Sequence, residues 1–347
     1  MVILLFFIFA LISIFYIVPP KNKTINNVVT VFLVIILILV AGLRGKNVDS
    51  DYYVYYDNWR TINMRDDLEY SFILIKKIIK SYLNLDFTYL LLTYATLGVS
   101  TKVIGIKKLS PLFYGSLLIY FSHYFVLHEM TQIRIGVATG FILIAINYLI
   151  KKNYYLFLLF MGIAIFFHQT STIALLIIFF SNSKRNMLSF ILLIPLGYVI
   201  YFSNSYLNIA VPLPFFQDKI ETYKEATESG FLKDSEINVF NALFLLRILV
   251  FYTLILFRKE ISKQFSAFYY LMKVYSVSLF TFLFLSDVPV FAFRIQELFG
   301  VVEIMLFPSL IFIFPTRFRW VGKTTVWFLA LVLLLLDIYY NKYILTS

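Results

Sequence analysis

Long runs of apolar residues, separated by short polar connections, make up most of the chain. The runs are continuous rather than alternating, which indicates helices that are apolar on all sides and not the strands of a barrel. A helix needs about 20 largely apolar residues to cross a hydrocarbon layer about 30 Å thick. This length predicts about twelve transmembrane helices, near residues 1–18, 25–43, 86–105, 111–127, 131–150, 154–167, 169–182, 187–206, 239–257, 265–285, 296–314 and 323–340.

Two of these runs, 154–167 and 169–182, are short for separate crossings, and they flank His168. They could be two half-depth helices that meet near His168. Basic residues flank the pair on both sides, at 151–152 and at 184–185, and this charge pattern requires the pair to cross the membrane twice.

Composition supports one integral membrane domain over residues 1–347. The chain is 61% hydrophobic and only 14% charged, whereas soluble domains have about 25% charged residues. It contains no cysteine, which excludes disulfides and thiol catalysis. The net charge of +11 would suggest a nucleic-acid partner in a soluble protein. Here the basic residues fall mostly in short loops, so membrane topology accounts for them and we expect no nucleic acid.

The distribution of lysine and arginine predicts the orientation. Cytoplasmic loops of membrane proteins carry the excess of basic residues. One set of short connections is rich in them, and it contains Lys21, Lys23, Lys107, Lys108, Lys151, Lys152, Lys184, Arg185, Arg258, Lys259, Lys263, Arg317, Arg319 and Lys323. We therefore expect both termini and two long loops, 44–85 and 207–238, to lie outside.

The two predicted external loops differ in character. Loop 44–85 opens with the charged and aromatic stretch RGKNVDSDYYVYYDNWR and ends with SFILIKKIIKSYL, residues 71–83. In the second stretch apolar residues recur at helical spacing with lysines between them, which predicts an amphipathic helix on the outer membrane surface. Loop 207–238 is rich in acidic residues and is expected to face water.

Four arginines fall on the outer half or outer edge of this topology: Arg44, Arg134, Arg247 and Arg294. Charged groups at membrane depth are costly and mark sites. Converging guanidinium groups would bind a phosphate-rich anion, and nearby aromatic rings would suit sugar faces. We therefore predict a site for a lipid-linked diphosphate sugar.

The predicted substrate-binding set is completed by Tyr52, Tyr55 and Glu297. Simpler interpretations stay open for these residues. Arg294 and Glu297 are spaced for an ordinary ion pair within one helix turn. The tyrosines of loop 44–85 could belong to the aromatic belt that forms at membrane interfaces. His168 could be a packed, hydrogen-bonded histidine.

Three stretches resemble a known family. GLRGKNVDSDYYVYY resembles the segment that opens the first external loop of the O-antigen and capsular repeat-unit polymerases, the Wzy type, in its EpsG-like branch. The segment from QIRIGVATG to FFHQTS is similar to that family's second signature, in which an arginine begins a span and a later short helix ends in Phe-His. FRIQELF resembles its late arginine-containing segment. Either Asp49 or Asp51 could match the family's aspartate.

The resemblance implies a membrane glycosyltransferase of the GT-C class in the bacterial inner membrane, with its active site facing the periplasm or outside. Such an enzyme polymerises undecaprenyl-diphosphate-linked oligosaccharides into O-antigen or capsular or exopolysaccharide. Its partners would be that lipid-linked substrate, membrane lipid and a chain-length regulator protein. The predicted catalytic residues are His168, Asp49 and Asp51, with His168 or an aspartate as the general base.

The remaining alternatives concern the metal and the reaction. Asp49-Ser50-Asp51 is a D-x-D motif that could hold a divalent cation, but the resemblance is to the metal-independent branch, so we expect no metal and no cofactor. A flippase for the same lipid-linked oligosaccharide would fit twelve spans and a basic cavity equally well. Transporters are often built from internal repeats, and none is evident here. A ligase that moves the finished glycan to another lipid is the third possibility.

Overall fold

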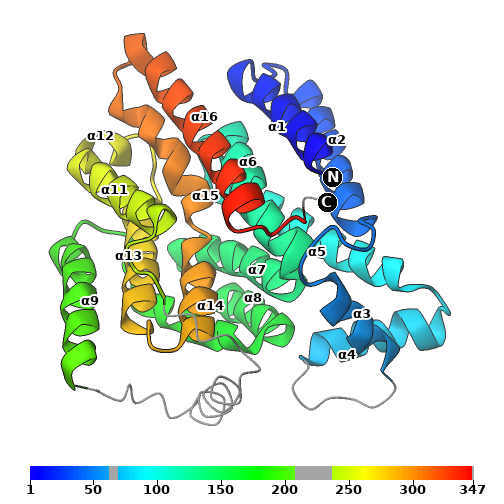
Figure 1. The fold of residues 1–347 in the computed structure, drawn as a ribbon. Coiled ribbons are helices and arrows are strands. Elements are labelled where there is room, and N and C mark those ends of the chain that lie inside the picture. The colour runs from blue at the N-terminus through cyan, green and yellow to red at the C-terminus, as the bar shows by residue number, and fades with distance from the viewer. Residues whose placement is uncertain (62–68, 208–236, 346–347) are drawn as a thin grey trace. The chain divides into compact units, whose positions relative to one another are not determined.

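The computed structural model describes residues 1–61, 69–207 and 237–345. The predicted loop 207–238 therefore lies almost entirely outside the described residues. The chain divides into two compact units (Figure 1). Unit 1 contains residues 1–179, 257–268 and 301–347, and unit 2 contains residues 180–256 and 269–300.

Unit 1 is built from helices throughout the part that the structure describes. Its α-helices are α1 (Val2–Ile17), α2 (Lys23–Gly42), α3 (Tyr52–Arg60), α4 (Tyr70–Lys77), α5 (Phe87–Leu109), α6 (Phe113–Ile119), α7 (Ile133–Ile150), α8 (Tyr154–Phe167), α12 (Arg258–Ser262), α15 (Glu303–Leu306) and α16 (Arg319–Leu335). Wider π-helical turns form η1 (Ile78–Tyr82), η2 (Tyr120–Thr131) and η7 (Leu336–Tyr340), and tighter 3₁₀ turns form η3 (Gln169–Phe179), η5 (Phe307–Ile313) and η6 (Thr316–Phe318).

The described part of unit 2 is also helical. These are α9 (Met187–Leu207), α11 (Ala242–Leu256), α13 (Phe268–Phe284) and α14 (Pro289–Gly300). Phe282 of α13 packs against Phe244 of α11 and Phe293 of α14, with ring centroids 4.5 and 5.4 Å apart. Aromatic packing therefore joins α11, α13 and α14.

The helix ends follow local sequence signals. Pro19 and Pro20 separate α1 from α2, and the side chain of Asn22 accepts hydrogen bonds from the amides of Thr24 and Ile25 at 2.8 and 3.3 Å. Asn153 begins α8 in the same way, accepting from the Leu156 amide at 3.1 Å. These caps satisfy donors that the first turn of a helix leaves unpaired.

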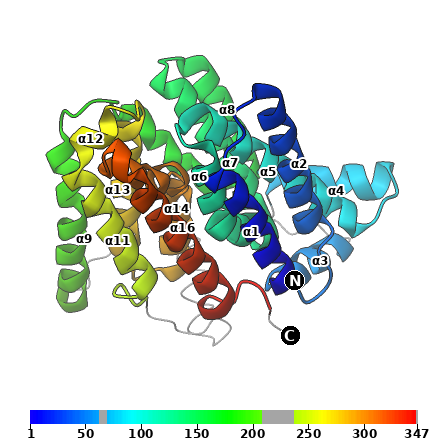
Figure 2. The same cartoon turned by 90° about the horizontal axis from the view of Figure 1, so that it is seen from above.

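The core of unit 1 is the stack of α2 on α5, α5 on α7 and α7 on α8 (Figures 1 and 2). At its lower right edge in Figure 1, α3 and α4 lie side by side. The chain breaks at His168, between the end of α8 and the start of η3, as the sequence predicts. This break places His168 outside both helices.

Among the described residues, four helical segments are long and apolar enough to cross a membrane: Lys23–Gly42, Phe87–Leu109, Ile133–Ile150 and Thr316–Tyr340. The pair Pro289–Gly300 and Glu303–Ile313 makes a fifth if it is one bent span. Six shorter apolar helices occupy positions where the sequence predicts spans. The all-helical membrane class is confirmed for the described residues. The count of about twelve spans and the GT-C fold stay predictions.

Two extended residues tie the C-terminal end to the first loop. Asp49 and Ile344 form an isolated antiparallel bridge, and the Leu345 amide donates to the Val48 carbonyl at 3.0 Å. No longer strand occurs among the described residues. Val48 and Asp49 of the first loop are therefore held by the chain that follows η7.

Candidate functional site

Arg44 and Asp49, both predicted site residues, form a buried ion pair with each other. Nε of Arg44 lies 2.7 Å from Oδ2 of Asp49. Nη1 of Arg44 also donates to the Ala41 carbonyl at 2.6 Å, where α2 ends. Burial raises the pKa of the Asp49 carboxyl, while the charge and hydrogen bond of Arg44 act in the opposite direction. The pair fixes the turn from the end of α2 into the first loop.

Asp51 lies two residues further on and begins α3. Its amide donates to Oδ1 of Asp49 at 3.0 Å, and its own carboxylate accepts from the Ser50 hydroxyl at 3.2 Å. Asp51 is half-buried, whereas Asp49 is fully buried. Within the described ranges, no group of three or more His, Cys, Asp or Glu side chains could hold a metal ion.

A second cluster joins three residues that are distant in the sequence. Nδ1 of His168 lies 2.9 Å from Oε1 of Glu69, and the other oxygen of Glu69 forms an ion pair with Nη1 of Arg134. Glu69 precedes the first residue of α4, Arg134 lies in the first turn of α7, and His168 lies at the break after α8. One carboxylate therefore holds both a predicted base and a predicted anion-binding arginine.

The three side chains of this cluster differ in their exposure to solvent. Glu69 and His168 are buried, and the side chain of Arg134 remains 22% exposed. Glu69 is absent from the set predicted from the sequence. A carboxylate at the start of an amphipathic helix is common, so only its distant partners reveal its position in the site.

Aromatic rings support the cluster from one side. The Arg134 guanidinium lies 5.8 Å from the centroid of the Tyr55 ring, a cation–π distance. Ring contacts of 6.2, 6.3 and 6.0 Å then connect Tyr55 to Phe72, Phe72 to Tyr94, and Tyr94 to Phe167, the neighbour of His168. Burial raises the pKa of the Tyr55 hydroxyl. The structure thus places Tyr55 beside Arg134.

Tyr52, the other predicted tyrosine, packs elsewhere on α3. Its ring makes an edge contact with Phe87 at 5.4 Å and stacks with Tyr56 at 6.2 Å. Tyr52 is buried in this aromatic group. Its contacts connect α3 to the start of α5.

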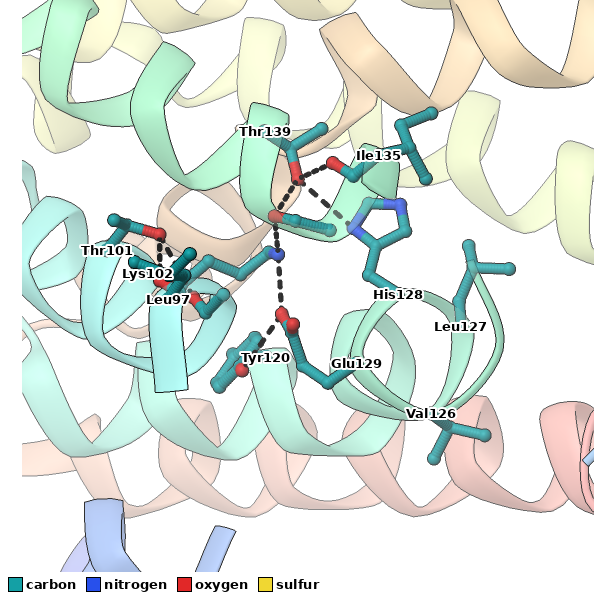
Figure 3. A network of polar contacts seen from close by, with 12 residues as sticks. Leu97, Thr101, Lys102, Tyr120, Val126, Leu127, His128, Glu129, Ile135 and Thr139 are labelled. Atoms are coloured by element: carbon teal, nitrogen blue, oxygen red, sulfur yellow. Dashed lines mark hydrogen bonds and ion pairs between the residues drawn. The ribbon is translucent and has the colours of Figure 1, made fainter. Parts of the chain in front are cut away.

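A third cluster lies inside the helix stack of unit 1 (Figure 3). Nζ of Lys102 on α5 donates to Oε1 of Glu129 and to the Gly136 carbonyl, each at 2.6 Å, and the Tyr120 hydroxyl donates to Glu129 at 3.2 Å. The ring of His128 lies 3.3 Å from the Thr139 hydroxyl. None of these residues is in the set predicted from the sequence.

This buried cluster connects to the first one. The backbone carbonyl of Glu129 accepts a 3.5 Å contact from Nη1 of Arg44. Gly98 lies so close to Glu129 that a Cβ there would collide with its Oε2. Lys102 and Glu129 are both buried, so each needs the other as its counter-ion.

Another buried pair joins the middle of the chain to its end. Nδ1 of His123 lies 2.7 Å from Oδ2 of Asp337, whose other oxygen accepts from the Asn341 amide at 2.9 Å. The Tyr124 hydroxyl donates to Glu303 at 3.2 Å. These contacts hold η2 against η7 and α15, within unit 1.

The remaining predicted residues, Arg247, Arg294 and Glu297, lie in unit 2. Arg247 is buried on α11, and its backbone carbonyl accepts from the Tyr275 hydroxyl at 3.2 Å. Arg294 is half-buried and Glu297 is buried, both on α14. Because Arg44 and Arg134 lie in unit 1, convergence of the four guanidinium groups stays a prediction.

Comparison with known proteins identifies the family. The family model described as EpsG family matches residues 27–346. The chain belongs to the EpsG family. The resemblance to the EpsG-like branch, seen in the sequence around Arg44, Arg134 and His168, is confirmed.

The same EpsG-family chain is similar to a curated protein over most of its length. It is 31% identical over 325 residues to the amylovoran biosynthesis protein AmsC of Erwinia amylovora. The alignment covers 89% of this chain and 85% of AmsC. No solved structure matches the chain.

Proposed function

We propose that this EpsG-family protein is a membrane glycosyltransferase that polymerises oligosaccharide repeat units carried on undecaprenyl diphosphate. The product would be an O-antigen or a capsular or exopolysaccharide, made at the outer face of the inner membrane. The family match and the similarity to a protein named for amylovoran biosynthesis support a role in polysaccharide biosynthesis. The observation that carries the chemistry is the single carboxylate of Glu69 between His168 and Arg134.

His168 is the proposed general base. An ionised carboxylate can only accept hydrogen bonds, so Glu69 selects the tautomer with the proton on Nδ1. In that tautomer Nε2 is the nitrogen that takes a proton from the attacking sugar hydroxyl. Glu69 then stabilises the imidazolium that forms, in the way that a buried carboxylate supports the histidine of a catalytic triad.

The proposed reaction is a displacement at the anomeric carbon of the donor chain. The oxygen of the acceptor hydroxyl forms a bond to the anomeric carbon of the donor chain and gives its proton to His168. The bond between that carbon and the diphosphate oxygen breaks, and the lipid diphosphate leaves with the electron pair. A general base of this kind contributes about 10²–10⁴ to the rate.

Arg134 is the proposed stabiliser of the leaving diphosphate. The Arg134 side chain is 22% exposed and paired with Glu69, so we infer that a phosphate oxygen can approach its guanidinium. A fixed cation at the position where negative charge develops lowers the barrier. Arg247, Arg294 and Glu297, which belong to unit 2, stay predicted substrate-binding residues.

The structure favours His168 over Asp49 for the base. Asp49 is fully buried and already paired with Arg44 and the Asp51 amide. Removing its charge would leave Arg44 buried without its counter-ion. We therefore assign Arg44 and Asp49 a supporting role in shaping the first loop.

The test is the glycan made by a strain that lacks this protein. We expect single repeats on the final carrier and no polymer ladder, and complementation should restore the ladder. Accumulation of lipid-linked repeats on the cytoplasmic side would indicate a flippase. Full-length polymer that stays on undecaprenyl diphosphate would indicate a ligase. Either result would overturn the proposal.

A further inference from the structure

The helix that follows Glu69 has one face fixed to the protein. α4 and η1 form a continuous helix over residues 70–82, and Glu69 is the residue before its first turn. Phe72 and Ile79 are buried on its inner side, and α4 packs against α8. Its orientation about its own axis is therefore set by contacts within unit 1.

Two lysines of this helix are engaged in fastening it to α3. Nζ of Lys76 donates to the carbonyls of Asn58 and Thr61, each at 2.7 Å, and Nζ of Lys80 donates to the Trp59 carbonyl at 2.9 Å. The last carbonyls of a helix lack partners within it and carry partial negative charge. Lys76 and Lys80 thus cap the end of α3 and lock the two helices together.

The opposite side of the helix carries an exposed apolar stripe. Large side chains recur at every fourth position: Tyr70, Leu74, Ile78 and Tyr82 are 70%, 48%, 41% and 72% exposed. Residues four apart in a helix lie on the same face. Leu83, also exposed, extends the stripe beyond the helix end. A face of this composition that met only water would be unfavourable.

Chain geometry keeps this stripe close to the membrane. Tyr82 precedes α5, which begins at Phe87 and is long and apolar enough to cross a membrane. The five steps from Tyr82 to Phe87 cover at most about 18 Å even when fully extended. Tyrosine is enriched at the membrane–water interface because its ring is apolar and its hydroxyl is polar.

The charge beside the stripe fits an anionic surface. Lys76 and Lys80 are turned toward α3, whereas Lys77 is exposed and lies one turn after Leu74, at the edge of the stripe. An amphipathic helix with an apolar stripe and a basic residue at its edge binds in the head-group layer, and anionic lipids strengthen that binding.

We propose that the helix over residues 70–82 lies in the head-group layer of a phospholipid bilayer, with the stripe of Tyr70, Leu74, Ile78 and Tyr82 in the acyl boundary. Lys77, at the edge of the stripe, faces anionic head groups. Because Glu69 immediately precedes this helix, the docked helix holds the carboxylate that joins Arg134 and His168 at a fixed membrane depth. A lipid-linked diphosphate lies at that same depth. The docking itself does not depend on the proposed reaction.

The absence of cysteine makes the depth of each residue measurable. Single cysteines replace Leu74, Ile78 or Lys77 in the full-length chain, and each is coupled to a nitroxide spin label. Phe32→Cys provides a lipid-facing reference, because Phe32 is an exposed residue of the crossing helix α2. The labelled proteins are placed in vesicles of phosphatidylethanolamine and phosphatidylglycerol. The collision rate of each spin label is measured with oxygen, which partitions into lipid, and with a nickel chelate, which stays in water.

We expect the ratio of oxygen collisions to chelate collisions at Leu74 and Ile78 to exceed the ratio at Lys77 by severalfold and to stay below the ratio at Phe32, which lies midway along α2. If the labels at 74 and 78 meet the chelate as often as the label at 77, the helix faces water and the proposal fails. If both are shielded from oxygen and chelate alike, protein covers the stripe and the lipid assignment is equally overturned.

The same measurement in an inactive variant tests the docking independently of the proposed reaction. The same labels in a His168→Gln chain should report the same depths, because docking requires no turnover. A failed polymerisation assay with unchanged depths would overturn the proposed function alone. Water-exposed labels in a chain that still polymerises would overturn the docking alone.

Discussion

One carboxylate oxygen of Glu69 lies 2.9 Å from Nδ1 of His168, although the two residues are 99 positions apart in the chain. The other oxygen pairs with Arg134. The start of α4, the start of α7 and the break after α8 therefore meet at a single side chain. This arrangement makes Glu69 a positioning residue whose effect can be separated from those of its partners.

Glu69→Gln should reduce polymerisation strongly while leaving the protein in the membrane. The amide keeps the size of the side chain but loses the charge that orients His168 and pairs with Arg134, so we expect a rate loss on the order of 10²-fold. Polymer formation is measured with purified protein and a lipid-linked repeat. Glu260→Gln is the matched control, because Glu260 is an exposed residue of α12. A normal rate for Glu69→Gln would show that the carboxylate is dispensable.

His168→Ala should abolish polymerisation, and added imidazole should restore part of it. The added base can occupy the space left by the ring and accept the proton. His168→Gln can still bond to Glu69 but cannot accept the proton, so it should be nearly inactive. If imidazole rescues neither variant and His168→Gln makes a normal ladder, the histidine is a packing residue and the base lies elsewhere.

Arg134→Lys should lose most activity at a normal membrane level. Lysine retains the positive charge but lacks the planar fork that binds a phosphate with two parallel hydrogen bonds. We predict the same for Arg294→Lys in unit 2. Arg60→Lys is the control, since Arg60 is exposed at the end of α3. Full activity in both the Arg134 and Arg294 variants would limit these arginines to structural pairing.

Breaking the Lys102–Glu129 pair should destabilise the protein rather than alter its chemistry. Lys102→Met leaves Glu129 buried without its cation, at a cost of about 3–5 kcal/mol in the free energy of unfolding. The double variant Lys102→Met, Glu129→Leu removes both charges and should recover much of that loss. Thermal unfolding in detergent checks whether the double variant unfolds at a temperature between those of the single variant and the parent protein. A single variant as stable as the parent would mean that water reaches the pair.

Two glycines provide a matched test of the space around Glu129. Alanine is favoured over glycine within helices by about 1 kcal/mol, and Gly162 on α8 has open space around it. Gly162→Ala should therefore be neutral or stabilising. Gly98→Ala, in contrast, would place a methyl group against the Glu129 carboxylate and should lower the unfolding temperature. Equal effects of the two substitutions would contradict the packing seen around Glu129.

Apolar periodicity predicts the helices well because each helix in a membrane must satisfy its own backbone. The run at 154–167 begins and ends where α8 does, and the break at His168 is present. The run at 111–127 is less accurate. The chain continues helically to Thr131 through wider turns, which keep His128 and Glu129 inside the helix stack.

The site is only partly predictable for a different reason. Arg134 and His168 stand out because each interrupts an apolar run. Lys102 interrupts the predicted span 86–105 in the same way. If every charged residue at membrane depth is taken as a candidate site residue, Lys102 belongs to the predicted set as well. Glu69 gives no such signal, because it follows a polar stretch in which acidic residues are ordinary. Its role depends on partners 65 and 99 positions away.

The pairing of Leu345 with Val48 has a consequence for biogenesis. The first loop cannot reach its final packing until every helix between these residues has been synthesised and inserted. During that interval Val48 and Asp49 lack their partners on the C-terminal segment, and a protease added to opened membranes should cut there. Nascent chains stalled before η7 should therefore be cleaved near residue 48, and completed chains should resist.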